Sequence, residues 1–126
     1  MMSSRLLVSI VDDDQSVRES LPDLLREFGF ASRTFSSAEE FLASDGIVQT
    51  RCLLLDIAMP GMCGPEMQKE LNRRKVKIPI IFITAQQDEA LRSRMLEHGA
   101  IACLFKPFSD TALLDALNTV FPLKSA

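Results

Sequence analysis

The chain has 126 residues, with 14 Lys and Arg against 17 Asp and Glu, which gives a formal net charge of −3 at pH 7. The length is that of one domain, and 47% apolar with 25% charged residues exclude disordered, collagen-like and low-complexity proteins. The acidic balance excludes a generally basic protein that binds the phosphate backbone of nucleic acids. We therefore expect residues 1–126 to form one domain that does not bind nucleic acid directly.

The sequence also indicates a compartment. Its apolar runs are far shorter than the roughly 20 residues of a membrane span, and the apolar stretch at 6–11 leads into three aspartates rather than a signal-peptide cleavage site. Cys52, Cys63 and Cys103 form no C-x-x-C pair, so we expect free thiols rather than disulfides or a zinc site. These features predict a cytoplasmic protein without membrane contact.

Apolar blocks and amphipathic blocks alternate along the first half of the chain. Residues 6–11 and 30–35 predict strands, and apolar residues at helical spacing between them predict a helix that Gly29 ends. Pro22 lies inside this helix and removes one backbone hydrogen bond, so we expect a kink or a break there. A capping box of Ser37 with Glu40 predicts a short second helix.

The alternation continues to the end of the chain. Residues 52–55, 78–83 and 101–105 predict three further strands, and the first of these is apolar at every position, as in a parallel sheet covered on both faces. The intervening helices are expected after Pro65 and over 88–98, and Ser109 or Asp110 caps a final helix. This (βα)5 order predicts an α/β fold with a doubly wound parallel sheet.

Polar side chains follow the expected carboxyl ends of four strands, and ligands of open α/β sheets bind at that edge. Each side chain has an ordinary structural explanation by itself, such as a helix cap, a turn or a solvated lysine. Their coincidence at one edge favours a functional site. These side chains are Asp12, Asp13, Asp14, Asp56, Thr84 and Lys106.

Carboxylates gathered at one edge repel each other, so they require positive charge nearby. Lys106 supplies an ammonium group, and Asp12, Asp13 and Asp56 offer the oxygen ligands that Mg²⁺ prefers. The absence of His or Cys at ligand spacing disfavours zinc. The predicted chemistry is transfer of a phosphoryl group to a carboxylate, with the metal and Lys106 neutralising the phosphoryl oxygens.

At this point the residues match a known family, because the chain resembles the receiver domain of two-component response regulators. The resemblance covers essentially the whole chain. In detail, the sequence is most similar to receivers that precede a LuxR-type helix-turn-helix domain. The stretches that carry it are Val11 to Asp14, Ser37 to Leu42, Leu55 to Gly64, Ile83 to Ala85, Gly99-Ala100 and Lys106 to Phe108.

The resemblance implies a flavodoxin-like sheet with strand order 2-1-3-4-5. It implies that Asp56 accepts the phosphoryl group, with Thr84 and Lys106 contacting that group. It also implies that Asp13, Asp56 and the backbone carbonyl of Ala58 ligate Mg²⁺ directly, with Asp12 doing so through water, and that the Lys106–Pro107 bond is cis. Members of the family commonly carry Tyr or Phe where this chain has Cys103.

The sequence therefore predicts a phosphorylation-dependent switch rather than an enzyme with a separate substrate. A histidine kinase or phosphotransfer protein is the expected donor. The expected response is a shift in the surface formed by residues 88–98, 101–105 and the last helix, which controls homodimerisation or an output partner in transcription regulation.

The sequence disfavours three other functions. A phosphatase of the haloacid-dehalogenase type requires an acid two residues after its nucleophile, where this chain has Ala58. A flavodoxin-type module requires a glycine-rich phosphate loop after the first strand, where this chain has three aspartates. A degenerate receiver that no longer accepts phosphate would lack acids, Thr84 or Lys106, all of which are present.

Overall fold

Five parallel strands form one sheet in the order β2-β1-β3-β4-β5. The computed structural model describes residues 5–121. The central strand β3 is buried at every position, as its continuous apolar sequence predicts. The strands are β1 (Leu7–Val11), β2 (Ala31–Phe35), β3 (Cys52–Asp56), β4 (Ile80–Thr84) and β5 (Ala102–Phe105).

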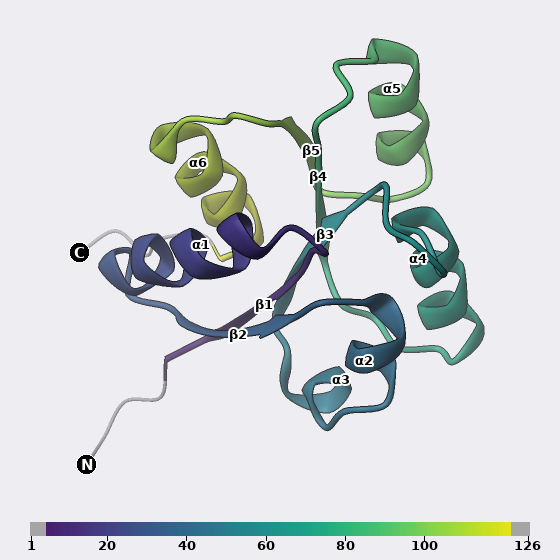
Figure 1. Cartoon of the computed structure of the whole chain (residues 1–126), viewed down its shortest axis with the longest axis horizontal. Helices are drawn as coiled ribbons and strands as arrows, with labels where there is room; N and C mark the ends of the chain where they lie inside the picture. The colour runs from purple at the N-terminus through teal and green to yellow at the C-terminus, as the bar shows by residue number, and fades with distance from the viewer. Residues whose placement is uncertain (1–4, 122–126) are drawn as a thin grey trace.

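Helices cover both faces of the sheet, as Figure 1 shows. One face carries α1 and α6, and the other carries the remaining four helices. This arrangement confirms the doubly wound α/β fold and the strand order that the sequence predicts. The helices are α1 (Gln15–Glu27), α2 (Ala38–Leu42), α3 (Gly46–Gln49), α4 (Gly64–Arg73), α5 (Glu89–Glu97) and α6 (Asp110–Val120).

Two apolar cores lie on the two faces of the sheet, because successive side chains of a strand point to opposite sides. Leu54 of β3 packs in the core under α1 and α6, with Leu25 and Leu117. Its neighbour Leu55 packs in the other core, with Met67 of α4. Both cores anchor β3, and so they fix the position of its last residue at the rim of the sheet.

Helix α1 runs from Gln15 to Glu27 without interruption, so the expectation of a break at Pro22 is wrong. Proline removes only one backbone bond, and Leu21 and Leu25 hold the helix against the sheet on either side of it. Gly29 ends the helix with a φ of +93°, the left-handed conformation that favours glycine.

Two other boundaries differ from the expectations. Strand β4 begins at Ile80 rather than at residue 78, because Pro79 has no N–H and contributes only its carbonyl, which accepts from the amide of Leu53 at 2.9 Å. The short helix α3 was not expected, and its first residue, Gly46, fits against the Phe35 and Phe41 rings.

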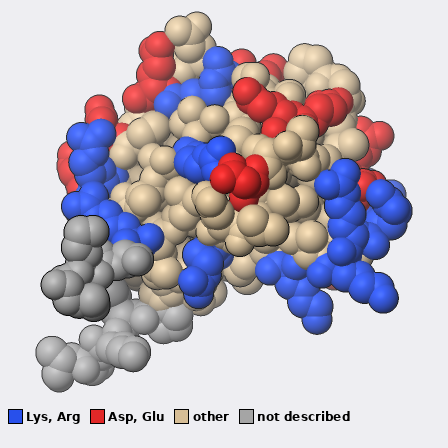
Figure 2. Space-filling view, turned by 90° about the horizontal axis from the view of Figure 1, so that it is seen from below, with Lys and Arg blue, Asp and Glu red and all other residues tan. Residues whose placement is uncertain are grey.

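Charged side chains are distributed unevenly on the surface. Figure 2 shows Lys and Arg gathered on the side of the molecule where α4 lies. These basic residues are exposed, at the end of α4 and in the segment after it: Arg73, Arg74, Lys75 and Lys77. None of the helices within residues 5–121 is long and apolar enough to cross a membrane.

Candidate functional site

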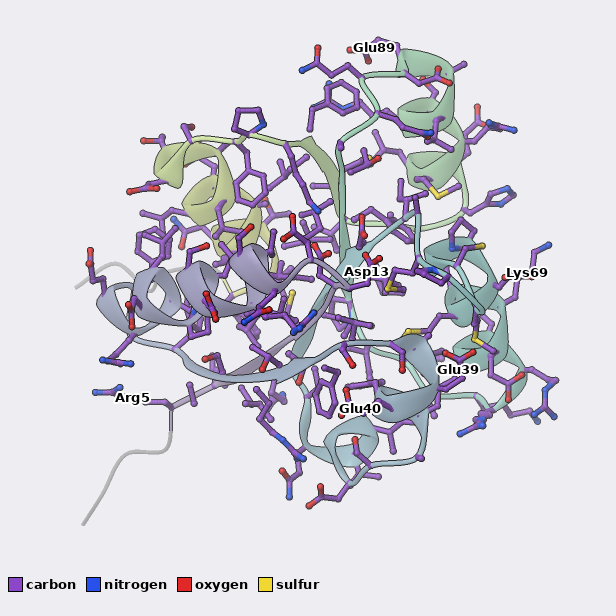
Figure 3. All side chains as sticks on the ribbon, in the orientation of Figure 1. Arg5, Asp13, Glu39, Glu40, Lys69 and Glu89 are labelled. Carbon is purple, nitrogen blue, oxygen red and sulfur yellow. The ribbon has the colours of Figure 1, made fainter. Side chains whose placement is uncertain are left out.

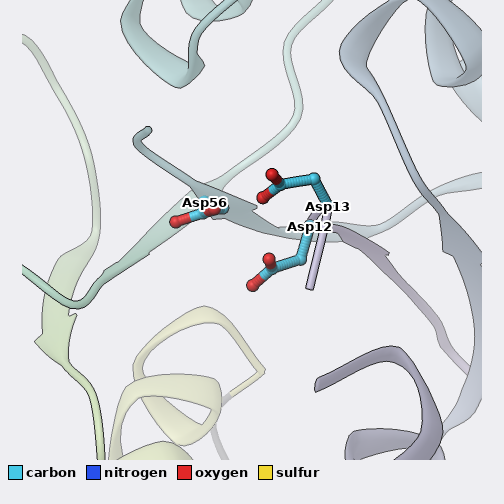
Figure 4. Close-up of side chains that lie close together, drawn as sticks. All are labelled: Asp12, Asp13 and Asp56. Carbon is cyan, nitrogen blue, oxygen red and sulfur yellow. The ribbon is translucent and has the colours of Figure 1, made fainter. Parts of the chain in front are cut away.

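Three carboxylates meet where strands β1 and β3 end (Figure 4). Asp12 and Asp13 follow β1 directly, and Asp56 is the last residue of β3. One oxygen from each of the three groups lies within 4.8 Å of the others. Asp12 and Asp56 are buried whereas Asp13 is exposed, so the cluster opens to solvent on the side of Asp13.

Hydrogen bonds hold both the carboxylate and the backbone carbonyl of Asp12. Its Oδ1 accepts from the backbone N–H of Asp14 at 2.9 Å, and its Oδ2 accepts from Lys106 Nζ at 2.8 Å. Its backbone carbonyl accepts from the Arg18 guanidinium at 2.8 Å. Asp14 is at the same time the N-cap of α1 and accepts from the amide of Ser16. The loop that carries the two acids is therefore fixed to the start of α1.

Asp56 lies in surroundings that disfavour its charge. It is 6% exposed, and burial together with the neighbouring Asp12 raises the pKa of Asp56 to about 7. The Lys106 ammonium, 3.7 Å from Asp56 Oδ1, opposes this increase. Burial opposes the charge of Lys106 as well, but the hydrogen bond to Asp12 and the charge of Asp56 raise its pKa overall.

Thr84 and Lys106 approach the acids from the other side of β3. Thr84 is 1% exposed and directly follows Ile83, the residue of β4 that pairs with Asp56. Its Oγ1 accepts from the N–H of Gln86 at 3.0 Å, and its carbonyl accepts from the N–H of Lys106 at 2.7 Å. The Lys106–Pro107 bond is cis, in agreement with the expectation.

The loop after β3 is tied down on two sides. Ala58 is exposed, two residues beyond Asp56. Glu39 of α2, labelled in Figure 3, accepts from the amide of Met62 at 3.2 Å and so holds the loop from outside. Gly61 lies against the Glu39 carboxylate and has a φ of +74°, the left-handed conformation that favours glycine.

Gly64 begins α4 immediately beneath the acid cluster. A Cβ at this position would lie 2.5 Å from the backbone oxygen of Asp56 and 3.1 Å from the ring of Phe82. The N–H of Gly64 donates to the carbonyl of Ile57 at 2.9 Å. Only glycine therefore allows α4 to start this close to the end of β3.

A groove with a volume of about 740 Å³ opens beside Lys106, between α1 and the segment that leads into α6. Its apolar wall includes Leu24 on α1 and Phe108. Acidic side chains of α1, Asp23 and Glu27, line the same groove. The acid cluster thus borders a partly apolar surface as well as open solvent.

The predicted side chains largely come together. Asp12, Asp13, Asp56, Thr84 and Lys106 meet at one rim, whereas Asp14 caps α1. The sequence did not point to the contacts of Arg18 and Glu39, which hold the surrounding loops. It included Gly64 only as the end of the stretch from Leu55 to Gly64, without its role at the start of α4. The only sequence signal for Arg18 is its position one helical turn after the N-cap of α1, from which a long side chain reaches back to the strand end.

The donor set fits a hard divalent cation. Three carboxylates within reach of one ion offer only oxygen, which is the preference of Mg²⁺. Burial and the neighbouring Asp12 raise the pKa of Asp56, and a dication would favour its charged form. The structure therefore contains an acidic pocket suited to Mg²⁺.

Comparisons with known proteins agree with this fold. Residues 8–118 match the profile of the response regulator receiver domain. Nodulation protein W of Bradyrhizobium diazoefficiens is 44% identical over 115 residues, which cover 91% of this chain and 51% of that protein. Transcriptional regulatory protein TdiR of Thauera aromatica is 39% identical over 116 residues, which cover 92% of this chain and 51% of that protein.

A solved structure extends the likeness to three dimensions. The CheX–CheY–BeF3–Mg²⁺ complex from Borrelia burgdorferi matches with a TM-score of 0.83 and 26% identity, covering 94% of this chain and 90% of that one. The chain belongs to the response regulator receiver domain family. It is thus a signalling domain of the two-component type, and it spans about half the length of the curated relatives it matches.

Proposed function

We propose that this chain is the phosphoacceptor switch of a two-component system and that Asp56 receives the phosphoryl group. The observation that carries the proposal is the position of Asp56. It is the one acid of the described cluster that both neighbours Asp12 and lies 3.7 Å from the Lys106 ammonium. Asp12 is already bonded to Lys106 and to a backbone amide, which leaves Asp56 to act as the nucleophile.

The transfer exchanges one bond to phosphorus for another. An oxygen of the Asp56 carboxylate forms the new bond, while the bond from phosphorus to the imidazole nitrogen of the donor histidine breaks and that nitrogen keeps the electron pair. Lys106 neutralises charge on the phosphoryl oxygens, and the Thr84 hydroxyl donates a hydrogen bond to one of them.

Magnesium is the proposed cofactor. Asp13, Asp56 and the carbonyl of Ala58 would hold it directly and Asp12 through water. When bound, it neutralises negative charge at the reacting oxygens. The acid cluster supports this assignment, and so does the related complex that contains Mg²⁺ and BeF3.

Phosphorylation changes the charge at Asp56 from −1 to about −1.5 to −2. A Thr84 side chain that turns toward the new group loses its bond with the amide of Gln86. The loop at 85–88 then shifts, and with it the surface of α5, β5 and α6. This shift is a change in the populations of two states, and we propose that it controls homodimerisation or an output partner in transcription.

The proposed donor is a histidine kinase or a phosphotransfer protein. The proposed location of the reaction is the cytoplasm. In this proposal residues 1–126 form the receiver, which does not bind nucleic acid itself. The receiver catalyses only its own phosphorylation and dephosphorylation. The curated relatives are about twice as long as this chain, and its motifs are similar to those of receivers that precede a LuxR-type domain. Both observations favour a regulator with a LuxR-type DNA-binding domain.

The role of Asp56 is tested by labelling with acetyl phosphate in the presence of Mg²⁺. We expect wild type to gain the mass of one phosphoryl group and Asp56→Asn to gain none, because the amide is no nucleophile. Asp23→Asn, which changes an exposed acid on α1, serves as the matched control and should label normally. Labelling of Asp56→Asn at the wild-type rate would remove Asp56 from its role.

Removal of the metal tests the cofactor independently. Chelation with EDTA should stop the labelling of wild type, and excess Mg²⁺ should restore it. An Asp13→Asn variant is expected to require more Mg²⁺ for the same rate, since it loses one carboxylate ligand. An unchanged rate in EDTA would contradict the magnesium assignment.

A further inference from the structure

Helix α5 is held to the rest of the molecule by few apolar contacts. Its one buried side chain is Met95, which is 5% exposed, and Leu91 packs beside the same core while partly buried; α1 buries Leu21 and Leu25. Leu96 of α5 is 42% exposed. In Figure 1 the helix lies at one end of the sheet beside β5. A helix with so small a packed face requires another attachment, or it opens easily.

Arg92 provides that attachment. Its guanidinium lies over the ring of Phe105, 4.6 Å from the ring centroid, and its Nε donates to the carbonyl of Cys103 at 3.1 Å. Its NH1 lies 3.4 Å from the carboxylate of Glu89, at the outer end of α5 in Figure 3. A planar guanidinium can stack and donate at the same time, so one side chain fastens α5 to two residues of β5.

The end of β5 that Arg92 contacts is also part of the proposed phosphorylation site. Phe105 pairs in register with Thr84, and the next residue, Lys106, donates its N–H to the Thr84 carbonyl at 2.7 Å. Thr84 and Lys106 are the residues expected to contact the phosphoryl group. Phe105 is thus joined to both residues, to Lys106 by a peptide bond and to Thr84 by strand pairing.

We propose that Arg92 is a positioning residue that couples helix α5 to the phosphorylation state of Asp56 through Phe105 and the Cys103 carbonyl. This inference rests on the proposed function of Asp56. The loop at 85–88 provides the covalent connection between Thr84 and α5, and the Arg92 contact provides the second connection, across the strand. With both connections in place, α5 moves with the end of β5; without Arg92, only the loop at 85–88 links α5 to Thr84.

Hydrogen–deuterium exchange of the whole chain tests this coupling, with and without beryllofluoride and Mg²⁺. In Arg92→Ala we expect the α5 amides to exchange about three- to tenfold faster before activation, with α1 unchanged. We also expect the change in α5 on activation to shrink by more than about half. Arg92→Lys should behave as Arg92→Ala, because an ammonium lacks the planar stack and the Nε donor.

The matched control is Arg94→Ala, which removes an exposed arginine from the same helix and should resemble wild type. If Arg92→Ala exchanges and responds as Arg94→Ala does, the coupling is wrong. A general loss of charge on α5 is excluded as the cause if Arg92→Lys is as impaired as Arg92→Ala.

The mass gain with acetyl phosphate, measured on the same samples, separates this inference from the proposed function. No gain in wild type would overturn the proposed function and the coupling together, and the exchange rates before activation would still decide whether Arg92 holds α5. A normal gain in Arg92→Ala together with a full-sized response of α5 would overturn the coupling alone.

Discussion

Two carboxylates of this molecule each bind cationic side chains, in opposite surroundings. Asp12 and Lys106 meet at 2.8 Å with side chains 0% and 19% exposed. Glu70, whose side chain is 20% exposed, binds Arg73 and Arg74, the latter at 2.6 Å, and these arginine side chains are 72% and 38% exposed. The first contact lies at the acid rim of the sheet, and the second lies on α4 within the basic surface of Figure 2.

The difference shows that burial, rather than the distance between the charged atoms, determines how much an ion pair matters for stability. Water reaches the arginine side of the Glu70 contact and screens it, so this contact contributes little to folding. The buried carboxylate of Asp12 has no such screening, and removal of Lys106 leaves a buried charge whose remaining contact is the backbone N–H of Asp14. We therefore expect the acid cluster to depend on Lys106 for its stability.

The largest effect is expected from Lys106→Met. This change leaves the buried Asp12 without its cation and should lower the free energy of unfolding by about 3 kcal/mol in metal-free buffer. Urea unfolding measures the loss, and added Mg²⁺ should recover part of it. Lys77→Met, which removes an exposed lysine, is the matched control, and an equal loss in both variants would mean that burial makes no difference.

A smaller effect, of opposite sign, is expected from Asp56→Asn. Burial and Asp12 raise the pKa of Asp56 from 3.8 to about 7, so its contribution to stability is complete below pH 3.8 and is lost as the pH rises through about 7. At about pH 8 the neutral amide should stabilise the metal-free protein by about 1–2 kcal/mol, allowing for screening. Unfolding measured across this pH range should give a flatter profile for the variant, and a steeper one would contradict the assignment.

The smallest effect is expected from Glu70→Gln on α4. Hydrogen bonds from Arg73 and Arg74 lower the pKa of Glu70 from 4.5 to about 2. Its contribution is therefore present above pH 4.5 and is lost as the pH falls through about 2. Thermal unfolding of the variant should differ only slightly from wild type, and high salt should remove the difference. A loss as large as that of Lys106→Met would contradict the role given to burial.

Much of the fold follows from the sequence because apolar periodicity and strand ends are local signals. The run at 52–55 predicted the central strand, and Gly29 and Ser109 mark helix ends that the structure confirms. The exact first and last residues of a strand depend on the neighbouring strands with which it pairs, and the sequence of the strand alone does not specify them. Residue 78 therefore appeared to start β4, although pairing gives the strand's first residue as Ile80.

The acid cluster was predictable because parallel strands deliver their last residues to a common edge. The supports of that cluster were not, since they depend on how separate elements pack. Arg18 reaches a backbone carbonyl and Arg92 reaches a ring and a carbonyl, and neither contact leaves a periodic pattern. The continuity of α1 through Pro22 likewise depends on packing against the sheet rather than on local preference.

Gly64 has a further consequence for anyone who wishes to control this domain. Because a single methyl group there would press on the Asp56 backbone and the Phe82 ring, Gly64→Ala acts as a steric wedge between α4 and the sheet. Such a wedge alters geometry while every charge stays the same. The variant therefore offers a means to displace α4 without changing a charge. It would separate the effect of helix position on signalling from the effect of the phosphoryl charge.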